Sequence, residues 1–388
     1  MDFKYKATRI ACYIGYIVQA IINNFLPILF IALQDVYGLG YEKLARLVVF
    51  NFATQIVTDL VTPKITAKIG YKKTVILCHF CAAFGLALLG VLPNIISPYL
   101  AIIISIIIYA FGSGLIEVIV SPIIEMLPTE NKSGNMSVLH SFYCWGQAFT
   151  IIGTTILIKF FGYTGWAFVP VCWAIIPFLN MFFFMRVPII EPPAESKRAG
   201  LGILLKNKRF LVYMVMMLCA GATEIAMAEW ASMFVQKGLG VSKVVGDLAG
   251  PCAFALFMGL GRMWYAWVSG KVDFRKTLIV LSAICFVCYI MVAICNIAWI
   301  SLLFCAICGF TVSISWPGIY SAGAKEFKEG SSVMYSVFAM CGDTGCCLGP
   351  WVLGIVADKF GLNMGFGVTS VFAVMMIIAC FILGKNKT

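Results

Sequence analysis

Twelve long apolar segments, separated by short polar ones, follow each other along the chain. Each is long and apolar enough to cross a bilayer as a helix, which takes about 20 residues. The pattern predicts spans over residues 9–33, 44–66, 74–94, 98–127, 134–159, 163–186, 209–235, 244–268, 275–295, 297–320, 332–357 and 363–384. Several exceed 25 residues, which indicates helices that tilt or extend beyond the bilayer.

The composition agrees with this pattern. Of the 388 residues, 62% are hydrophobic and 12% are charged, and the mean hydropathy is +0.97. A soluble domain carries about 45–50% apolar and about 25% charged residues, so a soluble enzyme is excluded. Strand-like alternation with turn signals, typical of a β-barrel, is absent. The sequence therefore predicts an all-α membrane protein with twelve transmembrane helices.

The basic residues indicate the orientation of the spans. With the N-terminus inside, 22 of the 28 Lys and Arg residues fall in inner segments, as the positive-inside rule requires. The net charge of +11 thus reflects topology, and we expect no nucleic-acid partner. Lys4, Lys6 and Arg9 lead directly into the first span without a cleavage site. These features predict a multi-pass protein of the inner (plasma) membrane with both termini cytoplasmic.

The longest polar stretch lies in the middle of the chain. Residues 187–208 contain a Pro-Pro pair, glycines and charges, which are typical of a linker. This stretch divides the chain into two predicted six-helix halves, residues 1–186 and 209–388.

The two halves repeat each other at an offset of about 200 residues. Three matches lie in register: YGLGYEK at 37–43 with KGLGVSK at 237–243, TAKIGYKKT at 66–74 with SGKVDFRKT at 269–277, and FGYTGW at 161–166 with FGLNMGF at 360–366. Because the matches link corresponding spans, they predict a repeat that is six helices long.

Duplicated six-helix halves joined by a cytoplasmic linker resemble the major facilitator superfamily of secondary transporters. That resemblance implies a substrate site between the halves near the bilayer midplane, and halves that rock to give alternating access. The segment after the second span is similar to the superfamily's G-x-L-A-D-R-x-G-R-R loop at Lys68, Gly70, Lys72 and Lys73. Ala67 stands at the position of the aspartate.

The second copy of this loop departs from the pattern in the same way. It retains Lys271 but has Gly270 at the aspartate, which helps to latch the cytoplasmic side in the superfamily. We therefore expect a differently built inner gate. Asp59 and Arg262 lie at corresponding cytoplasmic ends of the second and eighth spans, and with Lys68 and Lys271 they are the predicted gating residues.

A narrower resemblance is to the fucose-permease-like branch of sugar:proton symporters. Glu224 and Trp230 fit a pattern that this branch has in its seventh span, and LHSFYCWG at 139–146 looks like its entry to the fifth. A glutamate inside the fourth span, here Glu117, is a feature of proton-coupled members. The resemblance implies proton-coupled uptake of a sugar.

Four carboxylates fall at positions that we expect to lie near mid-membrane in the apolar segments: Glu117, Glu224, Glu229 and Asp343. Each costs about 2.5–3.5 kcal/mol at mid-membrane on insertion scales. They should therefore face a wet cavity or polar partners, and proton coupling requires a group that takes up a proton on one side and releases it on the other. We assign them to proton coupling. A buried ion pair or a helix–helix hydrogen bond is the structural alternative for each.

Polar and aromatic side chains in the spans are the candidates for substrate binding. Amides donate and accept hydrogen bonds, as sugar hydroxyls require, and aromatic rings stack on sugar rings. In the repeat, an amide in one half corresponds to a carboxylate in the other, and the first span has amides where the fucose permease has an aspartate. Joining helices is the alternative role for these amides. The candidates are Gln19, Asn23, Asn24, His140, Tyr143, Gln147, Trp230 and Trp316.

Two of the prolines inside the predicted spans, Pro122 and Pro317, indicate helix breaks. Pro122 follows Ser121 in the fourth span, and Pro317 follows Trp316 in the tenth. Proline removes a helical hydrogen bond, so both positions could expose backbone carbonyls to a cavity.

The leading interpretation is a proton-coupled symporter for a sugar or sugar-like small polar solute. Alternatives are a drug or metabolite:proton antiporter and a non-transporting sensor with a transporter fold. A Ser/His/Asp constellation and a ligand-spaced metal cluster are absent, and the CxxC pairs lack accompanying histidines. We therefore expect no enzyme, cofactor or metal. The expected partners are the solute, protons and the lipid bilayer, and the expected state is a monomer.

Overall fold

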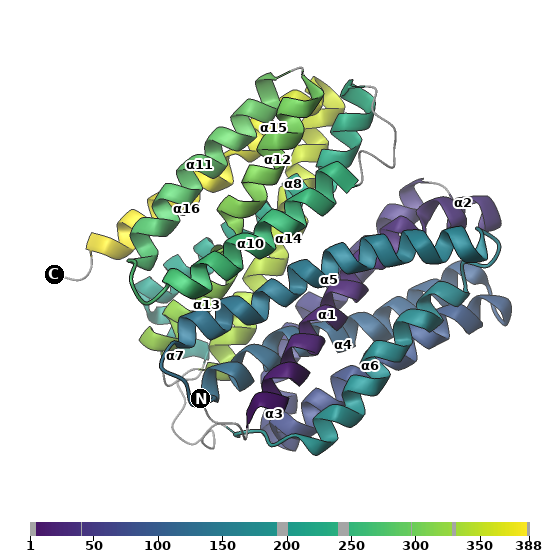
Figure 1. The fold of residues 1–388 in the computed structure, drawn as a ribbon, viewed down its shortest axis with the longest axis horizontal. Helices are drawn as coiled ribbons and strands as arrows, with labels where there is room; N and C mark the ends of the chain where they lie inside the picture. The colour runs from purple at the N-terminus through teal and green to yellow at the C-terminus, as the bar shows by residue number, and fades with distance from the viewer. Residues whose placement is uncertain are drawn as a thin grey trace. The chain divides into compact units, whose positions relative to one another are not determined.

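The computed structural model describes residues 5–39, 41–191, 201–239, 248–295, 297–327 and 331–385. Over these residues the chain consists of helices joined by short turns and contains no strand (Figure 1). The helices are α1 (Lys6–Ile28), α2 (Phe30–Tyr37), α3 (Tyr41–Val91), η2 (Leu92–Asn94), α4 (Pro98–Met126), α5 (Lys132–Phe161), α6 (Phe168–Arg186), α7 (Leu201–Lys206), α8 (Lys208–Leu239), η4 (Leu248–Cys252), α10 (Ala253–Val268), α11 (Phe274–Ile294), α12 (Ala298–Val312), α13 (Ser315–Glu326), α14 (Ser331–Phe360), α15 (Leu362–Thr369) and α16 (Val371–Lys385).

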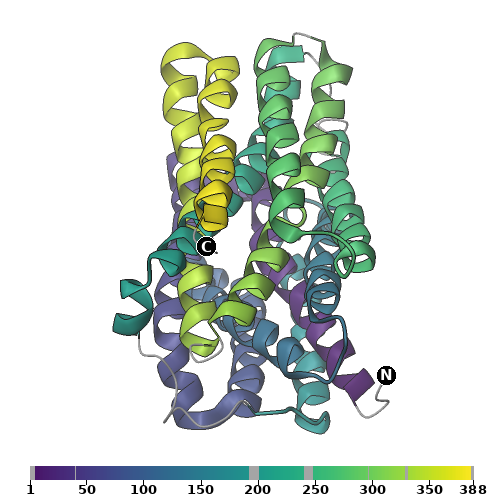
Figure 2. The ribbon, with the colours of Figure 1, turned by 90° about the vertical axis from the view of Figure 1, so that its left-hand side faces the viewer.

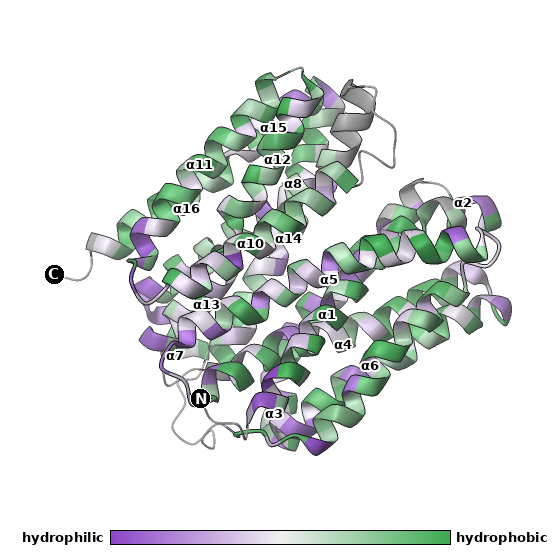
Figure 3. Ribbon diagram, viewed as in Figure 1, coloured by the Kyte–Doolittle hydropathy of each residue, from purple (hydrophilic) through white to green (hydrophobic). Residues whose placement is uncertain are grey.

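Ten helices in the described part of the chain are long and apolar enough to cross a membrane. Hydrophobic residues cover most of their length in Figure 3, and the prediction of an all-α, multi-pass membrane protein is confirmed. The count of twelve spans stays a prediction. One of the ten, Arg46–Asn94, has 49 residues and covers two predicted spans. The eighth predicted span corresponds to η4 and the 16-residue α10, and its first residues, 244–247, lie outside the described residues.

The two spans predicted over residues 44–94 form one long element, α3, with a single interruption. At Gly70 the backbone has φ 81° and ψ 164°, a conformation that residues with a Cβ rarely adopt. The backbone N–H groups of Tyr71 and Lys72 donate to the carboxylate of Glu191 at 3.2 and 3.3 Å. The first N–H groups of a helix have no partner within it, so Glu191 caps the helix that begins again after Gly70. The loop that the sequence predicts here consists of Gly70 alone.

The two prolines behave differently. Near Pro317 the helix breaks as predicted, because α12 ends at Val312 and α13 begins at Ser315. At Pro122 the prediction of a break is wrong, since α4 continues through it to Met126. One missing N–H donor leaves the rest of a well-packed helix intact, and residues 112–124 of α4 are all buried.

The chain divides into two compact units. The first unit comprises residues 1–129 and 145–196, and the second comprises residues 130–144 and 197–388. In the first, α3 packs against α4 and α6, and α1 packs against the same two helices. In the second, α8 packs against α14, and α11 packs against α12 and α16; Figure 2 shows the green and yellow helices of this unit from another side. The helix α5 begins in the second unit and ends in the first.

The predicted linker over residues 187–208 is described only in part. Residues 192–200 lie outside the described residues. Residues 240–243, which end the repeat match at 237–243, also lie outside them. Within the described part, Leu201–Lys206 form the short helix α7, which the linker prediction did not anticipate. The division into halves at this linker stays a prediction.

Close packing of α8 on α14 depends on glycine. A Cβ placed on Gly345 would collide with the backbone carbonyl of Leu218 and lie 2.9 Å from the backbone nitrogen of Ala222. Overpacking of this kind costs typically 1–3 kcal/mol and sometimes more. We expect Gly345→Ala to lower the free energy of unfolding by about 3 kcal/mol.

The matched control for this prediction is Gly367→Ala, because a Cβ at Gly367 meets only the Ala293 side chain, at 3.7 Å. Thermal unfolding of both variants in detergent tests the difference. Equal stabilities would show that α8 and α14 do not depend on this close approach.

Candidate functional site

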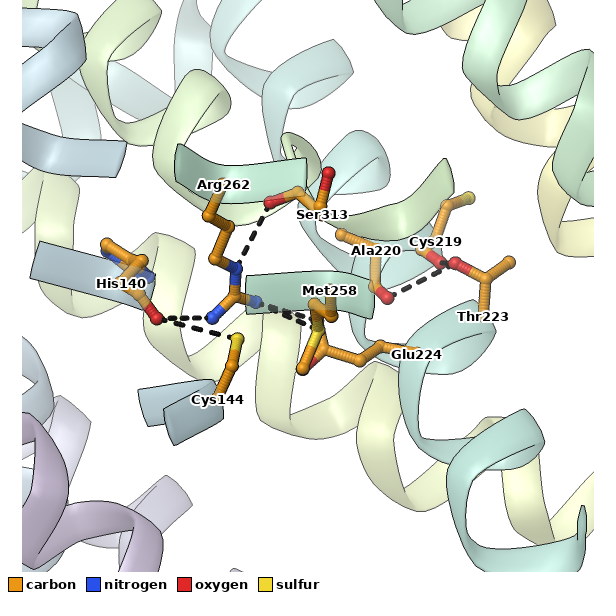
Figure 4. A network of polar contacts seen from close by, with 9 residues as sticks. All are labelled: His140, Cys144, Cys219, Ala220, Thr223, Glu224, Met258, Arg262 and Ser313. Carbon is orange, nitrogen blue, oxygen red and sulfur yellow. Dashed lines mark hydrogen bonds and ion pairs between the residues drawn. The ribbon is translucent and has the colours of Figure 1, made fainter. Parts of the chain in front are cut away.

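A buried arginine lies at the centre of the polar network in the second unit. Arg262 in α10 is 2% exposed, and its Nη2 lies 3.2 Å from Oε2 of Glu224 in α8. Figure 4 shows the guanidinium among side chains and carbonyls from several helices. A charge this deeply buried is tolerated when it is paired and hydrogen-bonded, and Arg262 meets both conditions.

The guanidinium also binds two backbone carbonyls. Its Nη1 donates to the carbonyl oxygen of His140 in α5 at 2.6 Å, and its Nε donates to that of Ser313 at 3.1 Å. Ser313 follows the last residue of α12, where the helix leaves carbonyls without intrahelical partners. One side chain thus joins α8, α5 and the break between α12 and α13.

Further hydrogen bonds attach the beginning of α5 to α10. The Ser137 hydroxyl donates to the carbonyl of Arg262 at 2.5 Å, and the Asn131 amide donates to that of Ala266 at 3.3 Å. The Ser269 hydroxyl donates to Oδ1 of Asn131 at 3.1 Å. Arg262 is therefore the charged residue in a series of hydrogen bonds that joins the beginning of α5 to α10.

A second polar network lies in the first unit. The Nε2 of Gln19 in α1 donates to Oε2 of Glu117 in α4 at 2.6 Å, and both residues are 5% exposed. One turn away, the hydroxyls of Tyr16 and Ser121 lie 2.7 Å apart. The carboxylate predicted for proton coupling and the amide predicted for substrate binding are thus in direct contact.

Asn23, four residues after Gln19 on α1, contacts two residues that the sequence reasoning missed. Oδ1 of Asn23 accepts hydrogen bonds from Asn51 at 3.2 Å and from Gln55 at 3.0 Å. Gln55 is completely buried and accepts a bond from Ser113 at 3.1 Å. The signal was present, because Asn51 and Gln55 are four residues apart and so share one face of an apolar span.

The other predicted carboxylates have different surroundings. Asp343 in α14 is 4% exposed, and its Oδ2 has no hydrogen-bond partner among the described residues. The ring of Trp316 lies against Gly342, the neighbour of Asp343, and its Nε1 also lacks a partner within the described part. Glu229 in α8 is exposed. Asp343 and Trp316 are therefore neighbours with unused hydrogen-bonding atoms.

The remaining predicted substrate residues are spread over both units. Asn24 donates to the carbonyl of Ala20 in its own helix at 2.8 Å. The ring of His140 lies 5.6 Å from that of Tyr320. Gln147 is buried in the first unit, and Tyr143 and Trp230 are half-buried in the second.

The predicted gating residues differ in burial. Asp59 is completely buried in α3, whereas Lys68 is exposed. Lys271 is exposed, and its Nζ lies 5.1 Å above the ring of Trp267. Arg262 lies beside Glu224, which is predicted for proton coupling.

A sequence model of the Major Facilitator Superfamily matches residues 12–350. The chain belongs to this superfamily. The match covers most of both units, and the resemblance to a transporter fold seen in the sequence is confirmed. The two polar networks therefore lie within a protein that has the fold of this superfamily.

Solved structures with the same fold include two sugar symporters. The chain matches the crystal structure of the E. coli fucose:proton symporter FucP with a TM-score of 0.81 and 15% identity, over 99% of this chain and 100% of FucP. It matches the proton:xylose symporter XylE bound to 6-bromo-6-deoxy-D-glucose with a TM-score of 0.83 and 12% identity, over 99% and 96%. At such identities the likeness establishes the fold alone.

A curated relative is the membrane protein MosC of Rhizobium meliloti, which is 25% identical over 176 residues. The match covers 45% of this chain and 42% of MosC, so less than half of the length of MosC is represented.

Proposed function

We propose that this protein is a proton-coupled symporter that takes up a sugar or a sugar-like small polar solute. The observation that carries the proposal is the buried contact between Gln19 and Glu117, 2.6 Å long, inside two apolar helices. The fold shared with a fucose:proton and a proton:xylose symporter supports it. The predicted orientation, with both termini cytoplasmic in the inner membrane, is part of the proposal.

The first unit supplies the groups that suit a polyhydroxylated solute. A sugar hydroxyl both donates and accepts, and so does a side-chain amide. Gln19, Asn23, Asn51 and Gln55 form a cluster of four such amides, and Oε1 of Gln19 and Oδ1 of Asn51 have no partner among the described residues. These two acceptors would receive hydrogen bonds from a bound solute.

In the second unit, the charge of the Glu224 carboxylate affects the contact between α5 and α10. While Glu224 is ionised, it balances the charge of Arg262. Protonation of Glu224 would remove that balance and leave the guanidinium with the carbonyls of His140 and Ser313. Taking up a proton would therefore change the free energy of the contact between α5 and α10, which is one way to link a proton to a conformational change.

Three further assignments belong to the same proposal. Asp343, which has no cation within 4.0 Å among the described residues, would be a second group that accepts a proton, and the exposed Glu229 would exchange protons with water. Asp59, Lys68 and Lys271 would contribute to the inner gate together with Arg262.

The direct test is the external pH of a lightly buffered, de-energised suspension of expressing cells. We expect alkalinisation when a transported sugar is added, because each solute molecule carries a proton inward. Sugars, organic acids and nucleosides are added one at a time, and cells with an empty vector provide the baseline.

The other functions give different results. Acidification on adding a solute would indicate an antiporter, and a silent suspension that still exchanges labelled solute would indicate uniport. Silence in both measurements across the panel would favour a non-transporting sensor. Each of these outcomes would reject proton-coupled sugar uptake.

A further inference from the structure

The second unit contains a cavity of about 700 Å³. Its wall is formed by the first turns of α5, α8 and α11, the last turn of α10, the turn that follows it, part of α13 and the end of α16. The lining includes segments that the charge pattern assigns to the cytoplasmic side. A volume of this size is within the range of about 300–1,000 Å³ that is typical of small-molecule sites.

Among the described residues, five ionisable side chains other than tyrosine line this cavity, and both carboxylates among them already have donors. Glu326 forms an ion pair with Arg209 and accepts a hydrogen bond from the Tyr213 hydroxyl at 3.2 Å. Asp273 accepts a bond from the backbone nitrogen of Lys276 at 2.8 Å and so caps α11. Arg209 also donates to the carbonyl of Leu383 at 2.9 Å. These three charges are therefore used within the protein.

The two remaining cations are Arg275 and Lys325. In the described part of the chain, neither has a hydrogen-bond acceptor or a carboxylate within 4.0 Å. Arg275 is only half exposed and lies against the backbone of Gly384. Withdrawing a guanidinium from water without a partner costs free energy. An anion bound in the cavity beside Arg275 would offset this cost.

We propose that this cavity binds a phosphate group, with Arg275 and Lys325 as its cationic ligands. Arginine matches the oxygens of phosphate with two parallel hydrogen bonds, and lysine contributes a point charge. Tyr265 and Phe274 supply aromatic surface beside the two cations, which would accommodate a ring or an acyl carbon attached to the phosphate. The phosphate belongs either to a soluble metabolite or to the headgroup of an anionic phospholipid.

This site is separate from the proposed transport function. None of its lining residues is among those proposed for proton coupling or solute binding. Occupation would connect the ends of six helices of the second unit, including the beginning of α5, and would therefore raise its stability.

The test uses the purified full-length protein in detergent and measures the midpoint of thermal unfolding and the binding isotherm. The probes are inorganic phosphate and glucose 6-phosphate, with glucose as the uncharged comparison. We expect both phosphates to raise the midpoint and glucose to have no effect at the same concentration. Arg275→Gln and Lys325→Gln should each weaken phosphate binding about tenfold or more, since a charged hydrogen bond contributes about 1.5–3 kcal/mol.

Lys276→Gln is the matched control, because Lys276 is adjacent to Arg275 on α11 but does not line the cavity. It should bind phosphate like the original protein. A second arm compares nanodiscs of phosphatidylcholine with nanodiscs containing phosphatidylglycerol. Stabilisation by phosphatidylglycerol alone, lost in Lys325→Gln, would assign the phosphate to lipid.

Two outcomes would overturn the proposal. One is that neither the soluble phosphates nor phosphatidylglycerol alters the midpoint or gives an isotherm. The other is that Arg275→Gln and Lys325→Gln, folded by size-exclusion chromatography, respond to the probes as Lys276→Gln does. Both can be observed whether or not sugar transport is found.

Discussion

Arg262→Gln is expected to lower the free energy of unfolding by about 3–5 kcal/mol, the usual effect of removing one partner of a buried ion pair. The substitution leaves the Glu224 carboxylate buried without its cation. It also removes donors from the carbonyls of His140 and Ser313, which are bound at 2.6 and 3.1 Å. Denaturant or thermal unfolding in detergent measures the loss.

The double variant Glu224→Gln/Arg262→Gln tests whether the loss of stability comes from the unpaired charge or from the change in side-chain shape. It removes both charges, so it should recover part of the stability that Arg262→Gln loses. The matched control is Arg209→Gln, which breaks a more exposed ion pair with Glu326. For a pair near the surface we expect about 0–1 kcal/mol. If Arg209→Gln and Arg262→Gln were equally destabilising, the ion pair of Arg262 would not be the centre of its network.

Glu117→Gln is expected to abolish uphill accumulation of solute and leave exchange in place. Glutamine keeps an oxygen that accepts the hydrogen bond from Gln19, so the helices α1 and α4 should remain joined. It cannot exchange a proton. One proton crossing 100 mV supplies about 2.3 kcal/mol, which sustains a concentration ratio of about 50-fold. In the variant the ratio should fall to about 1.

Membrane vesicles with an imposed proton gradient measure accumulation, and counterflow of labelled solute measures exchange. Glu130→Gln is the control, because Glu130 is exposed and lies between α4 and α5. It should accumulate solute normally. Undiminished accumulation by Glu117→Gln would contradict a coupling role, and loss of both accumulation and counterflow would indicate that Glu117 binds the solute instead.

The fold was largely predictable because each span can be recognised from the hydropathy of its own residues. Crossing a bilayer requires backbone groups that are satisfied within the segment, so hydropathy alone locates helices such as α4 and α6. The details that were predicted wrongly depend on contacts with residues far away in the sequence. The loop predicted around Gly70 became a one-residue interruption because Glu191, 120 residues away in sequence, caps the next helix. Pro122 did not end α4, which is buried around it.

The candidate site was predictable as a set of residues and not as a set of contacts. Glu117 and Glu224 were identified because charge in an apolar segment is costly. Their partners could not be assigned, since spacing within one helix says nothing about the helix that faces it. Asn51 and Gln55 were overlooked because amides without charge stand out less than carboxylates do.

The sequence by itself determined the membrane environment, the helical class and the superfamily, because hydropathy, repeats and motifs are local or periodic properties. Only the tertiary structure decided that Arg262 pairs with Glu224, that Gln19 meets Glu117, and that Arg275 and Lys325 line one cavity. These contacts join residues 38 to 98 positions apart and, in the cavity, helices from α5 to α16. Charges interact through space, and their distances depend on how the helices pack.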